Sequence, residues 1–383
     1  MSVFKNRQKL SSKHVPNKLP HRDEQLRQLF GLFEDVREGN VFFKTVQLIG
    51  SVGTGKTSSS LLFIREMSKL NSNVYSVYVN LKMLSDPSPF LVYSSLLTAV
   101  GVKPSRSRSP GELFEKFLAI VQKRKKDIFI IVVDEADELT GTRSLKGGKI
   151  VYNLTRFPEF GVENIAGTIF IARRNEWSEG LSFEEKSSLG SIVVYYPRYT
   201  KEQINDILRY RISESFREDT LEPHIIEYLA EITADLFQSD IRKALDILLY
   251  AGILADLEGA EKVEIAHVNR AIRNVLGYTV VSSDILSMLS FEDKIALYAT
   301  ILSLENSPRG YVSMSTIREY VEMLCETLRV KEISDEIVEL SLQKLYELGI
   351  IDMNGPRKIH VLSMLNVNEL KKEIVSHVKN RSV

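Results

Sequence analysis

The pattern of apolar and polar positions divides the first half of the chain into short strands separated by amphipathic helices. Residues 73–79 alternate apolar and polar side chains, as expected for a strand. Residues 128–133 are Ile, Phe and Val only, which is typical of a central parallel strand buried on both faces. Further strands are predicted at 46–49, 168–172 and 192–196, and helices at 23–36, 58–70, 89–100 and 111–126. This alternation predicts an α/β fold with a parallel sheet and right-handed crossovers.

The pattern changes after residue 197, where helices follow one another without strands between them. Four helical patterns with short connections are predicted at 200–216, 223–236, 239–257 and 264–276. They indicate a small all-helical domain, and the segment 277–284 that follows is predicted to be a linker.

The end of the chain has the pattern of a third unit. Helices are predicted at 291–304, 315–328, 334–348 and 366–379, with short strands at 350–353 and 358–363. Asn354-Gly355 lies between the two strands, and this dipeptide is a strong signal for a tight hairpin. Three helices followed by a hairpin is the layout of a winged-helix DNA-binding domain. The expected domains are therefore 1–197, 198–277 and 285–383.

The composition is that of an ordinary globular protein and excludes several classes. The chain has 383 residues, 44 % hydrophobic and 26 % charged, and its 50 basic and 50 acidic residues give a net charge of zero. A generally basic protein is excluded, so any binding to nucleic acid must come from local patches. The single cysteine, Cys325, excludes an intrachain disulfide, and no apolar run is long enough to span a bilayer. We expect a cytoplasmic protein with no membrane partner.

One such patch is the N-terminal segment. Residues 1–22 contain no acid, and their basic residues are Lys5, Arg7, Lys9, Lys13, Lys18 and Arg22. This segment is expected to be either a disordered, solvated arm or an arm that contacts phosphates.

A phosphate-binding loop lies between the first predicted strand and the next helix. Its residues match G-x-x-x-x-G-K-T and are Gly50, Ser51, Val52, Gly53, Thr54, Gly55, Lys56 and Thr57. The glycines let backbone N–H groups converge on phosphate oxygens, and the helix N-terminus adds positive potential. Lys56 is expected to reach the β- and γ-phosphates and the Thr57 hydroxyl to bind Mg²⁺, with Ser58 also in the binding site. The predicted cofactors are ATP or ADP and Mg²⁺.

An acidic pair follows the most apolar strand. Asp134 is expected to hold Mg²⁺ and orient its waters, and Glu135 to activate the attacking water. Acids at a helix N-terminus are also favoured by the helix dipole, which is the alternative explanation. The position of the pair downstream of a phosphate-binding loop favours the catalytic interpretation.

Arg242 is a third candidate for the site. It lies in the first turn of the helix at 239–257, with Ser239 as the expected N-cap. A cation there opposes the helix dipole, which suggests an anionic partner such as the γ-phosphate. An ordinary salt bridge to Asp240 or Asp246 is the alternative.

With these motifs and a winged helix, the chain resembles the AAA+ replication initiators of the archaeal origin-recognition and helicase-loading family. The resemblance covers most of the chain and includes residues 20–25 (PHRDEQ), 151–156 (VYNLTR), 186–189 (KSSL) and 345–351 (LYELGII). It implies an AAA+ P-loop parallel sheet with a helical lid, followed by the winged-helix domain. It also implies that Arg22 lies near the adenine and that the helix at 89–100 is an inserted helix that presses on DNA.

Two departures concern catalysis. The family usually has a polar sensor, an asparagine, just after the strand at 168–172, and this position is Arg173 here, with Asn175 two residues further on. Either residue could act as the sensor. The segment before KSSL normally offers an arginine, but this chain has Glu184-Glu185. A carboxylate would repel the charge of the transition state, so the chain is expected to be a poor arginine-finger donor.

A third departure concerns DNA. The expected recognition helix has Asp335, Glu336 and Glu339 in its N-terminal half, opposed mainly by Lys344, and this charge suits a phosphate-lined groove badly. We therefore expect weak DNA binding by the chain alone and stronger binding beside a sibling initiator. The candidate DNA-binding residues are Arg106, Arg108, Lys331, Lys344, Arg357 and Lys358.

These features predict a slow ATPase that acts as a replication initiator on double-stranded origin DNA. Its expected partners are sibling initiators, with the replicative helicase as a further candidate, and its expected location is the nucleoid. Two alternatives stay open. One is a P-loop ATPase whose winged helix regulates transcription, and the other is a non-hydrolysing interaction module in which bound nucleotide stabilises the fold.

Overall fold

The computed structural model describes residues 2–381 except 141–146, 236, 277–278, 282, 308–310, 349, 354–355, 357–358, 362 and 366. It divides into two compact units. The base unit comprises residues 11–212 and 237–242, and the C-terminal unit comprises residues 1–10, 213–236 and 243–383.

The base unit is built on one parallel sheet, which confirms the predicted fold class. Its strands are β1 (Lys44–Ile49), β2 (Val74–Asn80), β3 (Ile128–Asp134), β4 (Ile165–Ala172) and β5 (Val193–Tyr195). The strand order is β2-β3-β4-β1-β5, and every neighbouring pair is parallel. Because all the strands run the same way, their carboxyl ends share one edge of the sheet, and the β1 and β3 ends flank that of β4.

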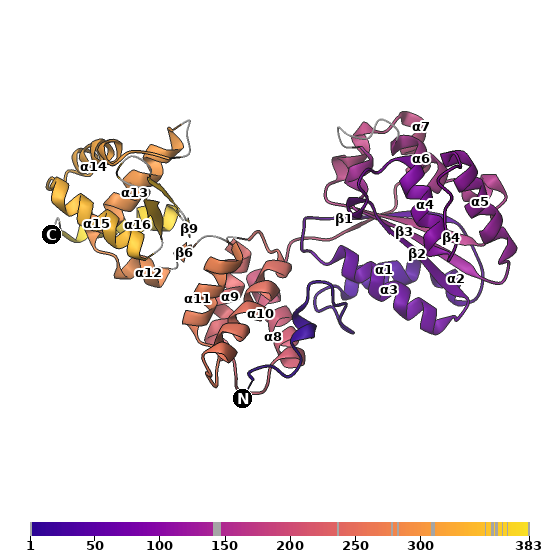
Figure 1. The fold of residues 1–383 in the computed structure, drawn as a ribbon, viewed down its shortest axis with the longest axis horizontal. Helices are drawn as coiled ribbons and strands as arrows, with labels where there is room; N and C mark the ends of the chain where they lie inside the picture. Colours follow the sequence, from indigo (N-terminus) through magenta and orange to yellow (C-terminus); the bar gives the residue numbers. More distant parts are fainter. Residues whose placement is uncertain are drawn as a thin grey trace. The chain divides into compact units, whose positions relative to one another are not determined.

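Helices cover both faces of this sheet (Figure 1). One face carries α1 (Asp23–Leu32), α2 (Glu34–Arg37) and α3 (Lys56–Leu70), and the other carries α4 (Pro89–Ala99), α5 (Pro110–Lys123), α6 (Gly147–Leu154) and α7 (Phe183–Leu189). Strand β3 serves both cores, because Ile130 and Val132 pack on the first face and Ile131 and Val133 on the second. Short 3₁₀ turns occur at Arg7–Leu10, Leu81–Met83, Ala136–Leu139, Phe157–Phe160 and Asn175–Gly180.

The helix predicted at 23–36 is broken into α1 and α2. Phe33 separates them with φ −116° and ψ 25°, outside the helical region. Its side chain is fully buried and its ring lies 5.3 Å from that of Phe63 on α3. Packing of this one ring against the sheet-facing side of α3 therefore overrides the helical pattern.

The C-terminal unit contains most of the helical lid. The lid helices are α8 (Lys201–Ser215), α9 (Pro223–Asp235), α10 (Ile241–Leu257) and α11 (Ile265–Leu276), and the boundary between the two units runs through α8 and α10.

The start of the chain belongs to this unit. Val3, Phe4 and Leu10 are buried, and the Phe4 ring lies 4.8 Å from that of Phe216. The N–H of Val3 also donates to the Asp256 carboxylate at 2.7 Å. The expectation of a disordered arm is therefore wrong for residues 2–10, because the side chains of Val3, Phe4 and Leu10 are buried in this unit.

The remainder of the chain folds as predicted for a winged helix. Its elements are β6 (Thr279–Val281), α12 (Ser283–Met288), α13 (Phe291–Glu305), α14 (Met314–Leu328), α15 (Asp335–Glu347), β7 (Ile351–Met353), β8 (Ile359–Val361), β9 (Ser363–Leu365) and α16 (Val367–Arg381). Strands β7 and β8 pair antiparallel, and Val312 forms a bridge to Ile359. The predicted linker contains β6, which pairs in parallel with β9. Residues 354–355 of the predicted turn lie outside the described residues.

No helix in the described part of the chain is both long and apolar enough to cross a membrane.

Candidate nucleotide site and DNA-contact residues

The phosphate-binding loop connects β1 to α3 with two backbone positions that only glycine occupies without strain. Gly53 has φ +79° and Gly55, which precedes α3, has φ +87°. The space around Gly53 also excludes a side chain, because a Cβ there would lie 2.3 Å from Oδ1 of Asp240. Asp240, two residues before Arg242, is thus packed directly against the loop.

The geometry of this loop fits a polyphosphate. Within the part of the chain that the structure describes, no backbone N–H of residues 53–57 donates to another protein group. These donors lie in the loop and the first turn of α3, where the helix dipole is positive. The loop can therefore accept phosphate oxygens without breaking any protein hydrogen bond made by these N–H groups.

Lys56 lies folded back on this loop. Its ammonium donates to the backbone oxygens of Gly50 and Ser51, the latter at 2.8 Å. Burial lowers the pKa of Lys56 to about 8, and the nearby Asp134 opposes this shift. A phosphate group beside the ammonium would restore its charge.

This lowered pKa gives a prediction for nucleotide binding. Below pH 8, Lys56 carries its charge already, and above pH 8 it must take up a proton to contact a phosphate. We expect ADP affinity to be constant from pH 6.5 to 8 and to fall above pH 8 by up to about tenfold per pH unit. Calorimetric titration at pH 9 in buffers of different ionisation enthalpy should show proton uptake. An affinity that stays constant to pH 9.5 would contradict the prediction.

Asp134 is the centre of the predicted metal site. It is buried, and its Oδ2 accepts hydrogen bonds from the Thr57 hydroxyl at 2.9 Å and the Tyr78 hydroxyl at 2.6 Å. Asn80 pairs with Asp134 across the β2–β3 register and approaches the same oxygen at 3.5 Å. A hydroxyl and a carboxylate oxygen this close are the protein ligands that Mg²⁺ takes beside phosphate oxygens. The residues present therefore fit the metal.

Tyr78 and Asn80 were not identified from the sequence. They occupy alternate positions at the carboxyl end of β2, next to the strand that ends in Asp134. Burial raises the pKa of Tyr78, and the neighbouring Asp134 raises it further, so the phenol stays protonated and donates. The sequence did contain a signal for these residues. Tyr78 and Asn80 are polar, lie two positions apart and so share one face of the strand predicted before the acidic one.

Glu135 pairs with Arg173, the residue that directly follows β4. Its Oε2 accepts from Nε and Nη2 of Arg173 at 3.1 and 2.7 Å. Asn175, the alternative sensor, is exposed at the start of a 3₁₀ turn and makes no side-chain hydrogen bond within the described residues. The structure thus brings Arg173, and not Asn175, to the acidic pair.

Arg242 forms a salt bridge with Asp240, one of the two alternative partners considered from the sequence. Its Nε and Nη2 lie 3.1 and 3.2 Å from the two carboxylate oxygens of Asp240. Asp240 also accepts from the Arg242 N–H at 3.1 Å, so it caps α10 in place of the expected Ser239. The Ser239 hydroxyl instead donates to the backbone oxygen of Tyr199. Arg242 is close enough to Lys56 to lower its pKa, which is consistent with a place beside the phosphates.

Arg22 is buried beneath the loop, with only 2 % of its surface exposed. Its guanidinium donates to the backbone oxygens of Thr54 at 2.8 Å, His21 at 2.8 Å and Pro197 at 2.7 Å. It also stacks 3.7 Å from the centre of the Tyr199 ring. Arg22 therefore connects the phosphate-binding loop, through Thr54, to the segment that follows β5, through Pro197.

Arg198 is a further cation at this loop that sequence reasoning missed. It is exposed, and its Nε lies 3.4 Å from Oγ of Ser51. It follows β5, and because β5 neighbours β1 in the sheet, the end of β5 lies beside the loop.

The candidate DNA residues have different surroundings. Arg106 and Arg108 are exposed in the connection from α4 to α5, and Lys331 is exposed before α15. Lys344 is paired with the buried Asp293 of α13. Arg357 and Lys358 lie outside the described residues.

The acids of α15 are also engaged. Arg318 of α14 lies 3.0 Å from Asp335 and pairs with Glu339 as well. Part of the negative charge that the sequence places on this helix is thus neutralised by α14 rather than by Lys344.

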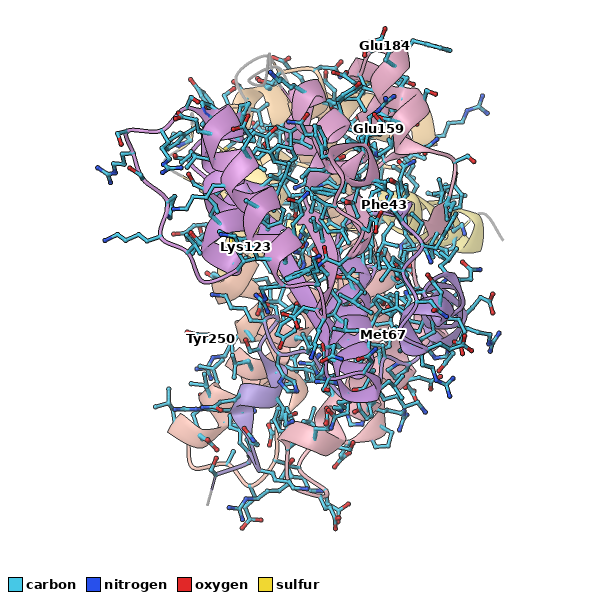
Figure 2. The ribbon with its side chains drawn as sticks, turned by 90° about the vertical axis from the view of Figure 1, so that its right-hand side faces the viewer. Phe43, Met67, Lys123, Glu159, Glu184 and Tyr250 are labelled. Carbon is cyan, nitrogen blue, oxygen red and sulfur yellow. The ribbon has the colours of Figure 1, made fainter. Side chains whose placement is uncertain are left out.

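Glu184, in the Glu184-Glu185 segment where the resemblance leads us to expect an arginine, is exposed at the N-terminal end of α7. Figure 2 shows it at the outer edge of the base unit, beyond Glu159. The exposed position suits contact with a neighbouring molecule, but the side chain has the wrong charge to stabilise a phosphoryl transition state.

The comparisons with known proteins match both parts of this architecture. A model described as an AAA domain matches residues 44–176, and one described as the Cdc6 AAA+ ATPase-type lid domain matches residues 205–273. The chain is therefore an AAA+ ATPase by its domains.

Relatives match over nearly the whole chain. It is 31 % identical to ORC1-type DNA replication protein 1 of Aeropyrum pernix, over 91 % of this chain and 87 % of that protein. It is 30 % identical to the protein of the same name from Sulfurisphaera tokodaii, over 91 % of this chain and 85 % of that protein. Among solved structures, the Aeropyrum pernix ORC1 protein in complex with DNA aligns with a TM-score of 0.65 and 28 % identity, covering 100 % of this chain and 99 % of that one.

Proposed function

Because the chain belongs to the family of ORC1-type DNA replication proteins, we propose that it binds double-stranded origin DNA and initiates replication there. The observation that carries this proposal is its likeness, over the full length, to the Aeropyrum pernix protein that was solved with DNA. A winged helix and an exposed basic loop at Arg106 and Arg108 support the same function.

We assign the nucleotide chemistry to the residues around the loop. The free N–H groups of residues 53–57 and the Lys56 ammonium hold the phosphates. Thr57 and Asp134 would hold Mg²⁺, which when bound would neutralise charge at the phosphate oxygens. Glu135 accepts the proton of the attacking water, and Arg242 moves from Asp240 to the γ-phosphate.

We expect ATP hydrolysis to be slow. The ATP-bound and ADP-bound forms of the chain would then act mainly as two conformational states of a switch. Arg242 lies at the start of α10, the helix that continues into the lid. If Arg242 binds a phosphate in place of Asp240, the start of α10 would shift, and the lid position would then depend on the bound nucleotide. Sibling initiators bound beside the chain, and the replicative helicase, are the proposed protein partners.

Footprinting on chromosomal origin DNA tests this function. We expect protection of a short duplex site, which becomes stronger when a sibling initiator is added. Equal protection of promoter DNA of the same length would favour a transcriptional regulator and overturn the assignment to origins.

The salt dependence of binding tests the basic loop. If about four to six phosphates are neutralised, log K should fall with log salt with a slope of roughly −4 to −5. Changing Arg106 and Arg108 together to alanine should weaken binding on every sequence and reduce the slope by about 2. Changing Lys125 and Lys126, an exposed pair of equal charge after α5, is the matched control and should leave the slope unchanged. If the change of Lys125 and Lys126 reduces the slope and the change of Arg106 and Arg108 does not, the loop at Arg106 and Arg108 does not contact DNA.

A further inference from the structure

The catalytic candidate Glu135 is held in an ion pair by Arg173. Two donors of one guanidinium, Nε and Nη2, converge on the same carboxylate oxygen at 3.1 and 2.7 Å. The side chains are 23 % exposed for Glu135 and 38 % exposed for Arg173. Both lone pairs of Oε2 are thus occupied by charge-assisted hydrogen bonds.

The backbones of both partners are fixed. The Arg173 N–H donates to both carboxylate oxygens of Asp137, at 3.2 and 2.9 Å. Glu135 has φ +58°, a conformation that a residue with a side chain keeps only when its surroundings hold it. The ion pair therefore links the residues that directly follow β3 and β4.

This arrangement opposes the chemistry assigned to Glu135. A carboxylate that activates water must accept the water proton as attack begins. The two N–H groups of Arg173 occupy Oε2 of Glu135 and compete with water for that oxygen. A neutral amide at this position cannot donate two charge-assisted hydrogen bonds to one oxygen.

We propose that Arg173 is a positioning residue that restrains Glu135, so that hydrolysis of bound ATP waits for the ion pair to open. The proposal rests on the proposed function, in which Glu135 activates the attacking water. It assigns the slow turnover proposed above to one side chain, which directly follows β4.

The test compares ATP turnover of the full chain with that of R173N. We expect kcat to rise by about ten- to a hundredfold, a part of the 10²- to 10⁴-fold that a general base supplies. The Kd for ATP, measured with a fluorescent analogue, should stay within about twofold, because the hydrogen bonds of Arg173 go to Glu135 and Asp137 and not to the phosphate-binding loop. R173K keeps the charge but loses the forked geometry, so its kcat should be intermediate. R174N removes the same charge from the exposed neighbour and should match the unmodified chain.

Each step is repeated in an E135Q background. Loss of turnover in E135Q, and loss of the R173N gain in E135Q/R173N, would establish that Arg173 acts through Glu135. If E135Q alone leaves turnover unchanged, the proposed role of Glu135 fails. If E135Q abolishes turnover but R173N leaves kcat unchanged or lowers it, the ATPase assignment stands and the restraint is overturned. A gain of equal size in both backgrounds overturns it too.

Discussion

Replacing Lys56 with alanine is expected to weaken ATP binding by about a hundredfold. The ammonium is the only side-chain cation that the phosphate-binding loop itself supplies, and its loss removes a charge-assisted contact of roughly 3 kcal/mol. Folding should change little, because the carbonyls of Gly50 and Ser51 that the ammonium bonds can turn to water in the open loop. Titration with a fluorescent ATP analogue measures the effect.

The matched control for this variant is Lys69→Ala. Lys69 lies at the other end of α3, is exposed, and pairs only with Glu66 within the described structure. Its removal takes the same charge from the same helix, so ATP affinity should be retained. An equal loss in both variants would mean that net charge, rather than contact at the loop, determines affinity.

The second large effect is expected for Arg22→Ala. This change leaves three backbone oxygens without their donor, at Thr54, His21 and Pro197, and opens a cavity beside Tyr199. The expected cost is about 3–5 kcal/mol of unfolding free energy in the base unit, and nucleotide affinity should fall with it because the loop loses its support. Urea unfolding followed by the fluorescence of the buried Trp177, the only tryptophan, reports on this unit.

Two further variants sharpen this result. R22K should recover little, because one ammonium cannot reach three oxygens that a planar guanidinium reaches together. Arg27→Ala, on the exposed side of α1, the helix that follows Arg22, removes only a surface pair with Glu24 and should cost less than about 1 kcal/mol. If R22A unfolds at the urea concentration of the unmodified chain and binds ATP normally, Arg22 does not support the loop.

Much of the fold could be predicted because its signals are local. The six apolar residues at 128–133 specify a central strand by themselves, and Gly50 to Thr57 specify a strand–turn–helix by their spacing. The five predicted strands and the helices α3, α4 and α5 accordingly begin and end within a few residues of the prediction, whereas the short helices α6 and α7 were not predicted. The break at Phe33 could not be seen, because its cause is a ring on α3 that is distant in sequence.

The site was predictable only in part, because some of its residues are distant in sequence and meet only in the folded chain. Residues that carry their own motif, such as Lys56 and Asp134, could be proposed from the sequence, and the structure places them on the same side of the sheet as the loop. Tyr78 and Asn80 join the site through the β2–β3 register, which no single stretch encodes. The burial of Arg22 likewise depends on segments around Thr54 and Pro197 that meet only in the folded chain.

The burial of Phe4 in the lid has a consequence for how the chain is made. The close approach of its ring to Gly252 leaves no room for a side chain there, since a Cβ would lie 2.3 Å from Cζ of Phe4. During synthesis, the first residues must therefore wait for the lid helices, while the base unit between them can already fold around its local pairings. A bulky fusion joined directly before Val3 should slow refolding of the lid more than that of the base.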